Sequence, residues 1–240
     1  MADLNNNFYL FVILIAILTQ INDIMISFSS ITLKVKGIGS SKIYNNLQPN
    51  ETYINRIKKD NNQSIFYFNL TENMIELIWY NELKSCDEMF SGCSNITEID
   101  FSKFDSSIIT SMYGMFMGCS SLNLLNLSNF NTSHVLDMDR MFSGCSSLIS
   151  LDLSNFNTSQ VTHMVGNFYG CSSLISLDLS NFNTSQVRYM DSIFSGCSSL
   201  ISLDLSNFNT SQVRYMDSMF SGCSSLISLD LSNFNTSSVI

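Results

Sequence analysis

The stretch that decides the fold is Met141–Val161, MFSGCSSLISLDLSNFNTSQV, because it returns almost unchanged at a fixed interval along the chain. Its cysteine shows the interval, since successive copies lie 26 positions apart. The column comprises Cys93, Cys119, Cys145, Cys171, Cys197 and Cys223. Columns of phenylalanine and glycine keep the same step without an insertion. Repeats of this length are typical of solenoids, in which stacked units share one continuous core.

Each unit contains two hydrophobic patterns. The segment Ser173–Asn181, SLISLDLSN, carries an L-x-x-L-x-L array whose last two leucines point to the same side of a strand. The segment between two such arrays, such as Asn209–Cys223, has apolar residues at helical spacing, with Gly222 placed to end the helix. These residues are Val213, Met216, Met219 and Phe220. The sequence therefore predicts an α/β solenoid, right-handed, in which each coil is a strand, a turn and a short helix.

Three further regions follow from this reading. The solenoid is expected over residues 86–240, as about six coils without an evident C-terminal cap. Residues 28–85 do not repeat and are expected to be a β-rich cap, with strands beginning near Ile31, Ser64 and Met74. Residues 1–27 are expected to be a signal peptide or a membrane anchor. Their apolar run is shorter than the roughly 20 residues that a spanning helix needs, which favours the signal peptide.

The repeat resembles the BspA-like leucine-rich repeat surface proteins over about Cys86 to Ile240. The motifs that carry the resemblance are the paired Met-Phe, Gly-Cys-Ser-Ser-Leu, and Leu-Asp-Leu-Ser-x-Phe-x-Thr-Ser. The resemblance implies a secreted or surface-exposed protein whose role is adhesion to host or matrix proteins.

An acidic column is the candidate binding face. It consists of Asp152, Asp178, Asp204 and Asp230, flanked by Ser176, Ser180, Ser202 and Ser206. Each aspartate lies between two inward leucines and is therefore expected to face outward. Like charges on neighbouring strands repel, so we expect raised pKa values unless a cation neutralises them. The column is either a solvated face or a binding face for a cationic protein segment or Ca²⁺, and Ca²⁺ is disfavoured because it needs about six to eight oxygen ligands.

The cysteine column favours a ladder of buried thiols, because identical positions on adjacent coils point in parallel and disulfides need converging Cβ vectors. Cys86 lies outside this column, so a disulfide from Cys86 to Cys93 or to Cys119 is the alternative.

Ten N-x-S/T triplets are glycosylation candidates if the chain enters a eukaryotic secretory route, although Asn- and Ser-rich sequence also produces such triplets by chance. They begin at Asn50, Asn62, Asn69, Asn95, Asn126, Asn131, Asn157, Asn183, Asn209 and Asn235.

These features together predict a secreted or cell-surface protein that recognises proteins non-covalently through its strand face, with extracellular or surface localisation. The alternative is a structural coat or wall component that self-associates through the ends of the solenoid. Nucleic acid is excluded as a partner by 11 Lys+Arg against 20 Asp+Glu. Membrane contact is expected only through the N-terminal segment or through an anchor missing at the C-terminus. No catalytic motif, metal-ligand spacing or cofactor motif is recognisable, so we expect neither an enzyme nor a cofactor.

Overall fold

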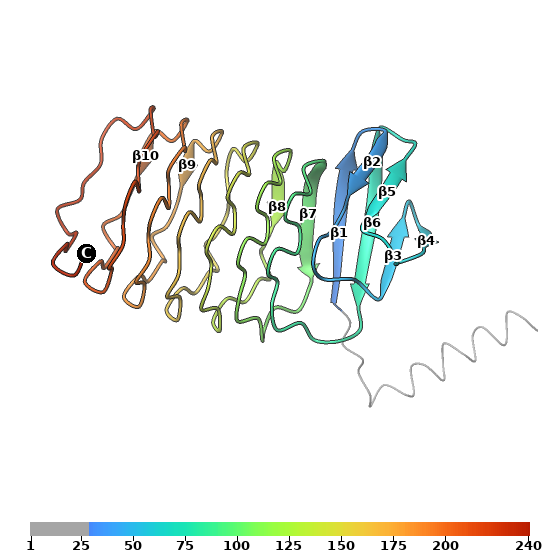
Figure 1. Ribbon diagram of the computed structural model, residues 1–240, viewed down its shortest axis with the longest axis horizontal. Coiled ribbons are helices and arrows are strands. Elements are labelled where there is room, and N and C mark those ends of the chain that lie inside the picture. The colour runs from blue at the N-terminus through green and yellow to red at the C-terminus, as the bar shows by residue number, and fades with distance from the viewer. Residues whose placement is uncertain (1–28) are drawn as a thin grey trace, which may run out of the picture.

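The computed structural model describes residues 29–240, which form an elongated stack of coils with an antiparallel β region at its N-terminal end (Figure 1). No helix occurs within these residues. The predicted α/β class is therefore wrong, and the described fold is all-β. Its strands are β1 (Ser29–Lys36), β2 (Gly39–Lys42), β3 (Glu51–Ile54), β4 (Ile57–Lys59), β5 (Ile65–Phe68), β6 (Glu72–Trp79), β7 (Ile96–Lys103), β8 (Leu124–Asn126), β9 (Ser176–Leu177) and β10 (Ser202–Leu203).

The N-terminal β region is built around the long pair β1 and β6. These strands run antiparallel, with Leu33 opposite Ile75, in a six-stranded sheet ordered β4-β3-β6-β1-β7-β8. The strands expected near Ile31, Ser64 and Met74 are present as β1, β5 and β6, whereas β2, β3 and β4 were not expected individually. Alternate residues of β6 are buried, which places one face of the sheet on the core.

Strand β7 joins the two architectures, because it pairs antiparallel with β1 and parallel with β8. Beyond β8, successive coils stack in parallel at the 26-residue interval. Each coil has two opposite sides that are named here by one example. The strand side is the segment equivalent to Ile175–Ser180, which contains β9 and β10. The turn side is the segment equivalent to His163–Gly170, which begins at a residue that bridges to the next coil.

The turn side replaces the expected helix. In a helix, each N–H would bond within its own coil. In His163–Gly170, alternate N–H groups instead donate to the next coil, and the residues between them form turns, as where Tyr169 donates to the carbonyl of Gly166 at 3.0 Å. The bonds to the next coil are Met164 to Tyr189 (3.0 Å), Gly166 to Asp191 (2.8 Å), Phe168 to Ile193 (2.9 Å) and Gly170 to Ser195 (2.7 Å).

A left-handed residue in the middle of each turn side prevents the helix. Its φ lies between 52° and 56° in every coil. The column comprises Glu88, Gly114, Arg140, Gly166, Ser192 and Ser218. A right-handed helix does not tolerate this conformation. Two glycines in this column were the sequence signal for it. Gly222 does adopt the left-handed conformation expected of it, with φ of 74°, but it ends a turn rather than a helix.

The core consists of inward columns that repeat the same contact from coil to coil. Phe168 stacks between Phe142 and Phe194, with ring centroids 5.6 Å and 5.7 Å away. Polar ladders accompany these stacks. The side-chain amide of Asn181 donates to carbonyls of the preceding coil, and the buried hydroxyl of Thr184 donates to the carbonyl of Asn209. Each coil is therefore tied to its neighbour by apolar stacking and by hydrogen bonds.

The predicted signal peptide or anchor, residues 1–27, lies outside the described residues. Between Ser29 and Ile240 no helix is long and apolar enough to cross a membrane.

Candidate binding face on the strand side

The four predicted aspartates and their flanking serines lie on the strand side with their side chains exposed. Along one coil, Leu177 and Leu179 are buried and Asp178 between them points outward. Asp152, Asp204 and Asp230 are exposed at the equivalent positions. Ser176, Ser180, Ser202 and Ser206 are exposed as well. The coil spacing thus assembles one row of carboxylates along the stack.

The expectation that mutual repulsion raises the pKa of these aspartates is wrong. In each coil a carboxylate oxygen accepts the backbone N–H of the serine two residues further on, at 2.9 Å. This hydrogen bond is the main reason why the pKa of each carboxyl is lowered, and it outweighs repulsion from the neighbouring aspartates. The row is therefore fully charged at neutral pH.

No lysine or arginine neutralises this row within residues 29–240. The ion pairs there join Lys34 to Glu72 (3.7 Å), Lys34 to Glu98 (3.0 Å) and Lys58 to Glu51. All of them lie on β1, β3, β4, β6 or β7 rather than in the aspartate row. Within residues 29–240 the charges of the row are thus compensated by hydrogen bonds from the backbone and side chain of the following serines, and by solvent.

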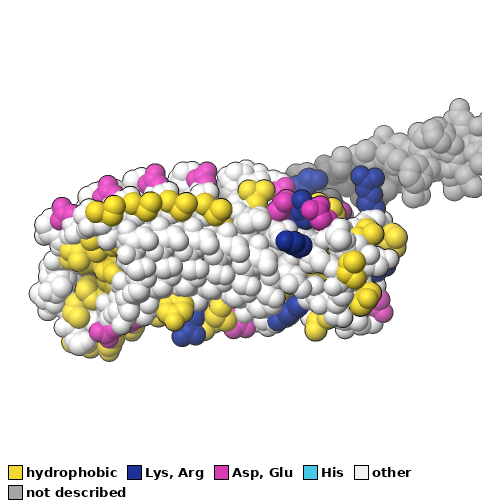
Figure 2. Space-filling view, turned by 90° about the horizontal axis from the view of Figure 1, so that it is seen from above, with side chains coloured by type: hydrophobic (Ala, Val, Ile, Leu, Met, Phe, Trp, Pro, Cys, Tyr) yellow, Lys and Arg dark blue, Asp and Glu magenta, His cyan; other side chains and the backbone are white. Residues whose placement is uncertain are grey.

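A second row on the strand side was missed by the sequence reading. It consists of isoleucines three positions before the aspartates, and these are Ile149 (56% exposed), Ile175 (45%), Ile201 (46%) and Ile227 (83%). Figure 2 shows hydrophobic side chains in a row along the repeats, with acidic side chains beside them. Backbone bonds between neighbouring members, such as Ile175 N–H to the carbonyl of Ile149 at 3.2 Å, hold the row in register. The signal for it was isoleucine at the same position in four consecutive units, just after the first leucine of each array.

A hollow of about 280 Å³ continues this face at the junction between the N-terminal β region and the coils. Its walls include Lys34, Met74, Asp100 and Leu124. Met74 and Leu124 are about half exposed there, at 50% and 59%. The hollow therefore places apolar surface beside Asp100, and Asn126 separates Asp100 from the row that begins at Asp152.

The turn side has a different chemistry. A hollow of about 310 Å³ lies where Gly166 carries no side chain, with Arg140, Met117 and Tyr169 among its walls. At the edge of this side, the ring of His163 stacks on Tyr189 at 4.7 Å.

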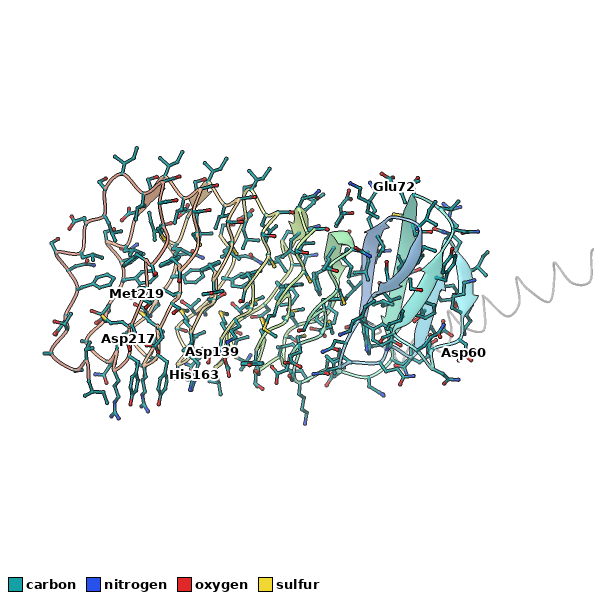
Figure 3. All side chains as sticks on the ribbon, turned by 45° about the horizontal axis from the view of Figure 1, so that its top comes forward. Asp60, Glu72, Asp139, His163, Asp217 and Met219 are labelled. Carbon is teal, nitrogen blue, oxygen red and sulfur yellow. The ribbon has the colours of Figure 1, made fainter. Side chains whose placement is uncertain are left out.

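Asp139 is a half-buried carboxyl on the turn side (Figure 3). Burial, and then the charge of Asp137, raise its pKa to about 6. No three His, Cys, Asp or Glu side chains gather as a metal site within the described part of the chain.

The cysteines form a thiol ladder in the interior. All seven are free, so the alternative disulfide from Cys86 to Cys93 or to Cys119 is not present. Cys171, for example, donates its S–H to the carbonyl of Phe142 at 3.2 Å. Burial raises the pKa of these thiols, for Cys93 to about 12, and a thiol that stays protonated is a poor nucleophile.

The glycosylation candidates are nearly all exposed. Asn126 is the exception, since it is half-buried and its side-chain amide donates to Asp100 at 2.8 Å. The other nine are Asn50, Asn62, Asn69, Asn95, Asn131, Asn157, Asn183, Asn209 and Asn235. The last five of these recur once per coil, and stacked strands are only about 5 Å apart. Bulky glycans could therefore not occupy every member of that column.

Fold and surface define the class of protein first: a repeat protein of stacked all-β coils with a long two-row face. The family described as Mycoplasma protein of unknown function, DUF285, matches residues 84–202 and 149–240. The two matches overlap, as expected for a repeat, and together they cover more than half of the chain. The chain therefore belongs to this family. No curated protein and no solved structure matches it.

Proposed function

We propose that this protein recognises other proteins non-covalently through its strand side, as a secreted or cell-surface protein. The observation that carries the proposal is the pair of parallel rows, one of exposed isoleucine and one of ionised aspartate, repeated over four coils. The resemblance to BspA-like surface proteins and the signal-like N-terminal sequence favour the surface location.

The isoleucine row is unfavourable in the isolated protein, and the aspartate row carries a mutual repulsion that its hydrogen bonds outweigh. A contiguous exposed apolar row keeps hydrophobic surface in water, and patches of this kind mark interaction sites. Carboxylates on neighbouring strands repel each other. Neither row contributes side chains to the core. Each aspartate supports its turn by accepting a serine N–H, as Asp178 does from Ser180, but folding does not explain the exposed isoleucines. A bound partner would cover the isoleucines and neutralise the aspartates.

The test compares the full chain with two double variants of the face, Ile175→Ser/Ile201→Ser and Asp178→Asn/Asp204→Asn. A matched control on the turn side is Asp191→Asn/Asp217→Asn. The full chain is immobilised, and the proteins that it captures from the medium and surface of cells that live alongside the source cells are identified by mass spectrometry. The dissociation constant between each purified captured protein and each of the four proteins is then measured. We expect each face variant to weaken a partner at least tenfold and the control to leave it unchanged. Equal binding by all four proteins contradicts the proposal.

A further inference from the structure

The spacing of the isoleucine row matches one kind of partner segment along the stack. Adjacent parallel strands lie about 4.8 Å apart, and a helix returns to the same face about every 5.4 Å. From Ile149 to Ile227 there are three coil steps, so a helix drifts out of register by only about 2 Å. An extended strand returns to the same face about every 6.7 Å and drifts by about 6 Å, which is more than one coil.

The width of the face matches a helix as well. Ile175 and Asp178 are three residues apart and only Ser176–Leu177 between them is strand, so at about 3.3 Å per residue their Cα atoms lie at most about 10 Å apart. A hydrophobic row and an acidic row lie side by side on one face of the repeats (Figure 2). A helix with its side chains is about 10–12 Å across. The residue exposed between the rows is the small Ser176, and it is Ser202 in the next coil. One helix can therefore lie over the serines and contact both rows.

The charge of the face decides the chemistry of that helix. The aspartate row is ionised and has no cationic partner within residues 29–240. Its members are closer together than the Debye length of about 8 Å at physiological salt, so their repulsion is only partly screened. Lysine or arginine along one edge of the bound helix relieves this repulsion.

We propose that the segment recognised by the strand side is a cationic amphipathic helix that lies along the stack. Its apolar stripe covers Ile149, Ile175, Ile201 and Ile227, and its basic edge faces Asp152, Asp178, Asp204 and Asp230. This inference rests on the proposed function and names its partner. Residues 29–240 contain no helix, so a second copy of this region does not supply the segment.

The probe is a labelled 14-residue peptide of leucine and lysine, with the leucines on one helical face and the lysines along one edge. A second peptide has the same composition in scrambled order. Both are titrated into the full chain by fluorescence anisotropy, and circular dichroism follows the helix content. We expect the amphipathic peptide to become helical and to bind at least tenfold more tightly than the scrambled one.

The same variants locate the site. Asp178→Asn/Asp204→Asn and Ile175→Ser/Ile201→Ser should each weaken the amphipathic peptide at least tenfold, and the aspartate variant should also reduce the salt dependence of binding. Asparagine keeps the oxygen that accepts the serine N–H, and thermal unfolding checks that each variant is folded. The turn-side variant Asp191→Asn/Asp217→Asn should bind like the wild type.

Two results would contradict the proposal that the partner segment is a helix. One is equal affinity for the scrambled peptide, and the other is equal loss in the turn-side variant. If captured proteins still depend on the strand-side residues while this peptide does not bind, the helical partner is rejected and the proposed function stands. If the captured proteins also bind equally well without those residues, the helical partner and the proposed function are both rejected.

Discussion

The turn side and the strand side of each coil come from the same repeat but differ in how much they bond to the neighbouring coils. On the turn side, alternate backbone N–H groups donate to the next coil over the whole segment, as in His163–Gly170. On the strand side, regular pairing is as short as the two residues of β9 and β10. The turn side thus provides much of the attachment between coils. The difference teaches that the strand side can carry two exposed rows because the stack does not depend on their side chains.

The largest expected effect comes from breaking the interior of the turn side. Phe168 is 1% exposed and stacks on a phenylalanine from each neighbouring coil. Phe168→Ala should lower the free energy of unfolding by about 3–5 kcal/mol, because it removes a buried ring and leaves a cavity. Ile175→Ala, on the strand side, should change it by less than about 1 kcal/mol. Urea denaturation measures both, and similar losses in the two variants contradict the division between the sides.

A smaller effect is expected from the backbone of the turn side. Gly196 has φ of 78°, and an added Cβ would lie 3.3 Å from the backbone of Gly170. Gly196→Ala should therefore cost about 1–2 kcal/mol from the left-handed conformation alone, and the close contact should add to it. Ser192 has φ of 55° in the same coil. Ser192→Gly removes the steric cost of the left-handed conformation, but it also raises the conformational entropy of the unfolded chain. The two effects oppose each other, so the free energy of unfolding should change by less than about 1 kcal/mol. A greater loss in Ser192→Gly than in Gly196→Ala, by urea denaturation, would contradict this account.

The last pair of effects concerns pH, and these effects should have opposite signs on the two sides. Asp139 on the turn side has its pKa raised to about 6 from an ordinary 3.8. Between these values the folded protein holds a proton that the unfolded chain has released, so this group makes stability fall as pH rises from about 4 to 6. Asp178 on the strand side has a lowered pKa, so its contribution is present above about pH 4 and is lost as pH falls through the folded pKa.

Urea midpoints measured between pH 3 and pH 8 test this contrast. Asp139→Asn keeps an oxygen for the N–H of Val165, and it should flatten the decline between pH 4 and 6 and raise stability at pH 7. Asp178→Asn should instead reduce the loss of stability below pH 4. An unchanged slope between pH 4 and 6 in Asp139→Asn would show that this carboxyl titrates normally.

The repeat interval and the outward aspartates could be read from the sequence because they depend only on spacing. A column that recurs every 26 residues fixes which residues of adjacent coils meet, as at the bridge from His163 to Tyr189. Asp178 between two leucines had to face outward on an extended segment, because successive side chains point to opposite faces. The strands β1, β5 and β6 were predictable for a similar reason, since their apolar and β-branched residues favour strands.

Three features could not be predicted reliably in this way: the absence of the helix, the exposure of the isoleucine row and the direction of the aspartate pKa shifts. Val213 and Phe220 have helical spacing, but repeated turns also bring such positions to one side. Ile175 looks like a core residue, and only the packed coil shows that it is 45% exposed. The pKa of Asp178 depends on a hydrogen bond from Ser180 that exists only in the folded turn.

By itself, the sequence determined that residues 86–240 are a stack of similar units and which columns each unit contributes, because register follows from counting residues. The tertiary structure decided where the backbone hydrogen bonds go. A neighbouring coil is present on each side of every inner coil, so N–H groups that could have closed a helix bond across to the next coil instead. These bonds between coils are the reason why the protein is an all-β stack and not the predicted α/β solenoid. The packing of the coils also places an apolar row beside an anionic row on the surface.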